Sequence, residues 1–160
     1  FKISWELDPA HTSAGNDLGL LYLAQGRTAK AESLFVYLLS LDSNKAGAHN
    51  NLGLIYMERG QWDLALDHFQ RSVRLQPHKA QGQDNLGLAY LKKGMWPQAE
   101  QSFRAAYEID PGDHKINYHL ASLYYIIKEY PKAVHHYDLA LRQGLAPDPK
   151  ILEALKPYRR

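Results

Sequence analysis

Residues 51–77 read NLGLIYMERGQWDLALDHFQRSVRLQP, and this stretch decides the fold. In its first half, apolar residues recur at the 3.6-residue spacing of a helix until Gly60, a residue type common just after helix ends. In its second half the same spacing runs from Trp62 through Phe69, and Pro77 stops it. The stretch therefore predicts two amphipathic helices, each about three to four turns long, joined by a short turn.

The pattern recurs along the chain with a period of 34 residues. A Leu-Gly pair, a Tyr, a Gly, an Ala and an aromatic residue keep this step with few exceptions. The frame predicts one domain over 1–160 with four full units at 12–45, 46–79, 80–113 and 114–147. Residues 1–11 fit the second half of an earlier unit, so the chain is expected to be a fragment of a larger protein. Residues 148–160 fit a capping helix and tail, because the last unit must cover its open apolar face.

The order Leu-Gly-x-x-Tyr, Gly, Ala, Phe, Pro at this period resembles the tetratricopeptide repeat (TPR) family. The resemblance implies an all-α fold, in which antiparallel pairs of helices A and B stack into a right-handed superhelical solenoid. The usual early Trp of each unit is missing, and the last unit departs most from the pattern, with Ala121, Lys128 and Leu145 in place of Gly, Gly and Pro. The Gly and Ala columns are interpreted as packing positions.

Composition excludes several classes of function. The chain has no Cys, which excludes disulfides and Cys-ligated zinc. A formal net charge of +2 is too balanced for a nucleic-acid surface, and no apolar run reaches the length of a membrane span. We therefore expect no nucleic acid partner and no membrane insertion. A cytoplasmic location is expected, with the bacterial periplasm as the alternative.

By the same resemblance, the concave groove is lined by side chains of the A helices. The columns at these positions contain amides, which suit an extended peptide backbone, and leucines, which would form an apolar strip. The candidate peptide-binding residues are Asn16, Asn50, Asn51, Asp84, Asn85, Leu20, Leu54, Leu88, Met57 and Tyr125. The amides are expected to face the surface.

Signals for catalysis or metal binding are weak. Phosphate-binding and metalloprotease motifs are missing, and His135 and His136 are adjacent, so they point in different directions on a helix. Some chaperone-binding relatives hold a carboxylate pair with a clamp of cations and amides, but here only Asn51 fits that set in the first three units. We expect no enzyme activity, no cofactor and no metal.

The favoured function is a scaffold or adaptor that binds a peptide or helix of another protein in the groove. Two alternatives stay open. The half repeat at 1–11 could stack on a second chain to form a homo-oligomer. The chain could also be the part of a larger enzyme that recruits its substrate.

Overall fold

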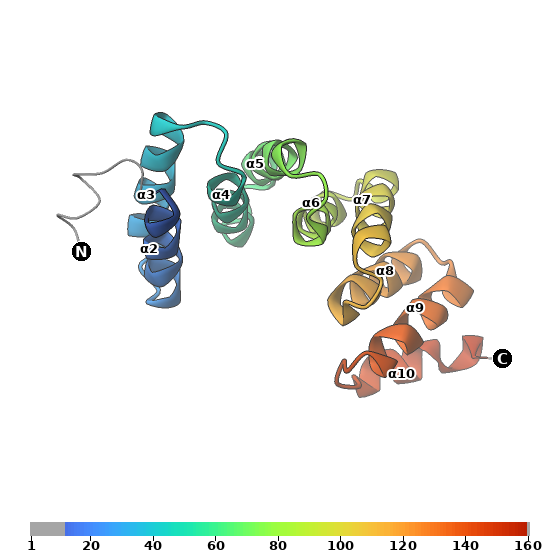
Figure 1. Ribbon diagram of the computed structural model, residues 1–160. Helices are drawn as coiled ribbons and strands as arrows, with labels where there is room; N and C mark the ends of the chain where they lie inside the picture. Colours follow the sequence, from blue (N-terminus) through green and yellow to red (C-terminus); the bar gives the residue numbers. More distant parts are fainter. Residues whose placement is uncertain (1–11, 160) are drawn as a thin grey trace. The chain divides into compact units, whose positions relative to one another are not determined.

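The computed structural model describes residues 12–159, and in this range the secondary structure is helical throughout (Figure 1). The predicted all-α class is confirmed. The predicted half repeat at 1–11 lies outside the described residues. The α-helices are α2 (Thr12–Ala24), α3 (Thr28–Leu41), α4 (Ala46–Glu58), α5 (Trp62–Leu75), α6 (Ala80–Lys92), α7 (Trp96–Ile109), α8 (His114–Ile126), α9 (Tyr130–Arg142) and α10 (Pro149–Leu155), followed by the 3₁₀ helix η1 (Lys156–Tyr158).

The helices pack as consecutive pairs, α2 with α3, α4 with α5, α6 with α7, and α8 with α9. The chain forms two compact units, one ending at Pro77 and the other beginning at His78. The first unit contains the pairs α2–α3 and α4–α5, and the second contains the other two pairs with α10 and η1. The assignment of 1–160 to one domain, with repeat boundaries at 12–45, 46–79, 80–113 and 114–147, stays a prediction.

In three of the four helix pairs within residues 12–159, a glycine closely approaches an aromatic ring, whereas α8 has Ala121 at the corresponding position. A Cβ atom built on Gly53 of α4 would lie only 2.6 Å from Cε1 of Phe69 on α5. Gly19 faces Phe35 and Gly87 faces Phe103 in the same way. The three phenylalanine side chains are fully buried. The 34-residue recurrence of Gly and Phe is therefore the recurrence of one packing contact.

The turns between paired helices need a left-handed residue. Gly26, Gly60 and Gly94 have φ of 70°, 72° and 71°, and Lys128 takes the same conformation with φ of 65°. The backbone hydrogen bonds agree, because Glu129 N donates to Tyr124 O at 2.8 Å as Gln61 N donates to Tyr56 O at 2.9 Å. The last turn thus keeps the geometry of the others although its residue is not glycine.

The helix α10 covers the end of the second unit. Leu155 is buried in the same apolar cluster as Leu120 and Tyr137. Asp148 caps the N-terminus of α10, and its carboxylate accepts a hydrogen bond from Lys150 N at 2.8 Å. The hydroxyl of Tyr137 on α9 accepts a hydrogen bond from Asp148 N at 2.9 Å. No helix within residues 12–159 has the length and apolar character needed to cross a bilayer.

Lys128→Gly should stabilise the chain. A lysine in the left-handed region destabilises the folded chain by about 1–2 kcal/mol, and glycine removes this cost. Glycine also increases the conformational entropy of the unfolded chain, which offsets part of the gain. We expect a gain of about 0.5–1 kcal/mol in the free energy of unfolding, measured by urea denaturation. The reciprocal change Gly94→Lys should destabilise the chain by a similar amount. An unchanged or lower stability of Lys128→Gly would contradict this account of the turn.

Candidate functional site

The apolar members of the predicted groove keep part of their surface exposed. Leu20 on α2 and Tyr125 on α8 are each 43% exposed. Leu54 and Met57 on α4 and Leu88 on α6 are half-buried. By contrast, Leu52 and Ile55, which lie on the opposite side of α4, are sealed in the core. The first helices of the four pairs, α2, α4, α6 and α8, are the predicted A helices. They carry apolar groups that the core covers only in part, and Leu88 packs against the core of the second unit.

The polar members of the predicted groove differ from the expectation that they face the surface. Asn51, Asp84 and Asn85 are buried, and Asn16 and Asn50 are half-buried. In the first unit, Asn51 Nδ2 on α4 donates a hydrogen bond of 3.2 Å to Asn16 Oδ1 on α2. These groups could not be placed from the helix pattern alone, because their burial depends on the neighbouring repeat.

The second unit has an ionisable pair in the same register. His119 Nδ1 on α8 lies 2.8 Å from Asp84 Oδ1 on α6. Both contacts join residues 35 positions apart, so each links one A helix to the next. Within each compact unit the polar columns thus connect one repeat to the next, and their binding of a peptide backbone stays a prediction.

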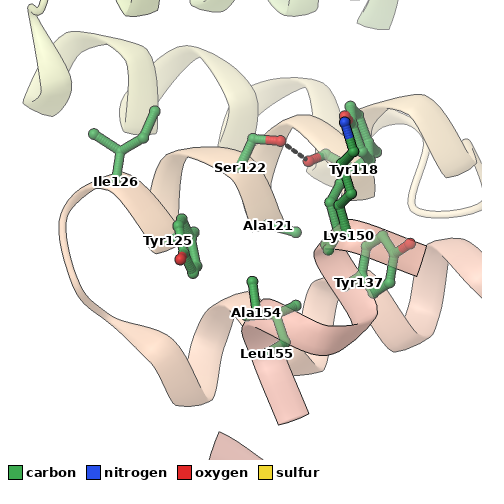
Figure 2. Close-up of a pocket in the computed structure, with 10 residues that line it drawn as sticks. Tyr118, Ala121, Ser122, Tyr125, Ile126, Tyr137, Lys150, Ala154 and Leu155 are labelled. Carbon is green, nitrogen blue, oxygen red and sulfur yellow. Dashed lines mark hydrogen bonds between the residues drawn. The ribbon is translucent and has the colours of Figure 1, made fainter. Parts of the chain in front are cut away.

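An apolar cavity of about 280 Å³ lies between α8 and α10 in the second unit (Figure 2). We call it the α8–α10 pocket. It is lined by Tyr118, Ala121, Ser122, Tyr125, Ile126, Tyr137, Lys150, Ile151, Ala154 and Leu155. Figure 2 shows Tyr118 and Lys150 at one end and Tyr125 and Ile126 at the other.

The small side chains of three lining residues leave the pocket open. Ser122 stands in the column that carries Leu20, Leu54 and Leu88 in the earlier repeats. Its hydroxyl donates to Tyr118 O of its own helix at 2.9 Å, so it does not reach across to α10. Ala121 and Ala154 line the remaining gap. A leucine at position 122 would extend into this space.

Of the predicted site residues, only Tyr125 lines the α8–α10 pocket. Sequence reasoning placed the rest of the site elsewhere because the second wall comes from α10, which was expected to be only a cap. One signal was present in the sequence, since Ser122 breaks the leucine column. That Lys150 lies in the same pocket as Ser122 could be learned only from the structure.

A buried polar cluster in the second unit centres on Asn117, which is fully buried. His136 Nδ1 donates to Asn117 Oδ1 at 2.8 Å, and Asn117 Nδ2 donates to Gln143 Oε1 at 2.9 Å. The ring of His136 stacks on Tyr124. Burial among these groups lowers the pKa of His136 from 6.5 to about 4, with a smaller contribution from the charge of His135.

The first unit uses the same two repeat positions for a histidine pair. His49 Nδ1 lies 3.0 Å from His68 Nδ1, and burial lowers the pKa of both rings. One Nδ1 must donate and the other must accept, so at most one of the two rings can be charged when the bond is formed. Within residues 12–159 no three His, Asp or Glu side chains gather as a metal site would require. Only His49 of this pair stands where the family usually has its early Trp, and its side chain is buried.

Comparison with known proteins agrees with this geometry. Models of the tetratricopeptide repeat match residues 44–111 and 85–149, which together span two thirds of the chain. The chain belongs to the tetratricopeptide repeat family. No curated protein was found to match it by sequence.

Solved structures share the fold at low sequence identity. The structure described as a functional characterisation of Pseudomonas aeruginosa PilF has a TM-score of 0.85 and 23% identity, with 96% of this chain and 71% of that chain covered. A MamA crystal structure has a TM-score of 0.78 and 23% identity, with coverages of 99% and 87%. MamA from Desulfovibrio magneticus RS-1 has a TM-score of 0.75 and 23% identity, with coverages of 85% and 75%.

The low pKa of His136 predicts a loss of stability in acid. The unfolded chain binds a proton near pH 6.5 and the folded chain only near pH 4, so the stabilisation is complete above 6.5 and is lost as the pH falls toward 4. His136→Gln keeps a donor for Asn117 but does not titrate. We expect its melting temperature to fall less between pH 7 and pH 5 than that of the wild type. After allowance for partial exposure, the difference is about 1 kcal/mol, or about 2–4 °C.

The control for this measurement is His78→Gln, because His78 is exposed. Its melting temperature should follow the wild type at both pH values. Equal pH slopes for His136→Gln and the wild type would show that the buried ring is not the cause.

Proposed function

We propose that the chain is a non-catalytic interaction scaffold that binds a peptide or helix of another protein along the exposed faces of its A helices. Membership of the tetratricopeptide repeat family supports the general role of a protein-interaction scaffold. The observation that carries the finer proposal is the partly exposed apolar column at Leu20, Leu54 and Leu88. Uncovered apolar surface of this kind marks interaction sites.

The proposed contact is mainly hydrophobic. Burying one leucine side chain contributes about 1.5–3 kcal/mol, which corresponds to about one to two powers of ten in affinity. The polar groups beside the leucines are already bonded to one another, as in the Asn51–Asn16 contact. Their role in the proposal is to hold the A helices within each compact unit in register, so that the leucines of that unit present a fixed surface to the ligand.

Self-association is the second candidate, and one observation favours it. The pair α2–α3 exposes Leu21 at 52%, Val36 at 50% and Leu41 at 47%. A second copy of the chain could cover these side chains. The mass of the chain in solution, measured at increasing concentration, separates this candidate from a scaffold that binds other proteins as a monomer.

The proposed function is tested with peptides selected from a random displayed library on the wild-type chain. Leu54→Glu and Leu88→Glu place a charge in the apolar column of one unit each, so at least one of them should weaken the selected peptides by about tenfold or more. Leu64→Glu is the matched control, since Leu64 is 48% exposed on helix α5. Binding is measured by fluorescence anisotropy after circular dichroism has shown equal folding.

If the selected peptides bind both column variants as tightly as the wild type and lose affinity only for Leu64→Glu, the proposal is wrong. The ligand would then lie on the B helices.

A further inference from the structure

We propose that the α8–α10 pocket binds a bulky apolar side chain that has a carboxylate next to it, so that the partner peptide is acidic around its anchor residue. This inference rests on the proposed function and names the chemistry of its ligand. It follows from the size of the pocket, from the state of its polar groups and from its one charged lining residue.

The size of the pocket fits a side chain. Its volume of about 280 Å³ lies just below the range of about 300–1,000 Å³ that drug-sized ligands occupy. It is open to the surface along Tyr125 and Ile126, which are exposed at 43% and 47%. An aromatic or large aliphatic side chain could therefore enter from solvent and contact Ala121 and Ala154 at the wall.

The body of the pocket has few polar groups left for a ligand. The Ser122 hydroxyl is bonded to its own helix, and the Tyr137 hydroxyl is bonded to the backbone of Asp148. A polar group placed there would lose its hydrogen bonds to water without replacement. The ligand group inside the pocket is therefore apolar.

The charge at the pocket is positive. Lys150 is the only charged residue among those that line it, and in the part of the chain that the structure describes its ammonium makes no ion pair. The acidic groups nearest to it in the sequence make other bonds: Asp148 accepts from the backbone nitrogen of Lys150, not from its ammonium. Glu153 lies 3.4 Å from Lys156 Nζ.

A second cation, Lys115, lies on the same helix as Tyr118 but does not line the pocket. Lys115 precedes Tyr118 by three residues on α8, which places both on one face of the helix. Lys115 also makes no ion pair within residues 12–159. Because Tyr118 and Lys150 share one end of the pocket, an anion is favoured at that end and an apolar group in the rest (Figure 2).

Three probes of one shape test this directly: 4-phenylbutyrate, 4-phenylbutanamide and 4-phenylbutylamine. They are titrated into the full chain and followed by NMR through the methyl groups of Ala121, Ala154 and Leu155. We expect the carboxylate to bind about 1.4- to fivefold more tightly than the amide, because an exposed ion pair contributes about 0.2–1 kcal/mol. The amine should bind most weakly, and added salt should reduce the differences.

Two variants separate the contribution of the Lys150 charge to probe binding from that of the cavity. Lys150→Glu should reverse the order of carboxylate and amine, whereas Lys30→Glu on α3 should leave it unchanged. Ser122→Leu restores the leucine of the earlier repeats and should abolish binding of all three probes without lowering the melting temperature. Since Lys150 is exposed, its variant tests the inference even if Ser122→Leu does not fold.

Equal affinity for carboxylate and amide, or methyl shifts that Ser122→Leu does not remove, would overturn the inference. So would a dimer of the wild type that Ser122→Leu dissociates, because a second copy of the chain would then occupy the pocket. None of these results would overturn the proposed function, which depends on whether Leu54→Glu and Leu88→Glu weaken the selected peptides.

Discussion

In three of the four helix pairs within residues 12–159, the close approach of a glycine on the A helix to a phenylalanine on the B helix is the contact on which the structure depends. At Gly53 and Phe69 the ring fills the space that a side chain on the A helix would need. The phenylalanine is thereby fully buried, and the two helices are fixed as a pair. Because the glycine side of the A helix is used in this way, its other faces remain for the next repeat and for solvent.

Contacts between successive A helices use polar as well as apolar groups. The bonds from Asn51 to Asn16 and from His119 to Asp84 occupy the same register in different units. A buried polar group is costly unless it is paired, so such a contact favours one alignment of neighbouring helices over others. In this account the polar columns set the positions of the apolar side chains, which form the proposed binding surface.

Much of the fold could be predicted from the sequence, because a 34-residue recurrence of Gly, Ala and aromatic residues is a local pattern with one packing solution. The Lys128 turn shows the limit of such patterns, since its left-handed backbone is imposed by the helices on either side. The candidate site was less predictable. The burial of Asn51 depends on a partner 35 residues away, and the pocket beside Ser122 depends on where α10 packs.

The most direct measurement is a crystal structure of the chain bound to the tightest peptide selected from a displayed library. The account predicts that the peptide lies along the A helices, with an apolar side chain between Ser122 and Ala154 and a carboxylate near Lys150. A peptide bound to the B helices, with the α8–α10 pocket empty, would contradict it.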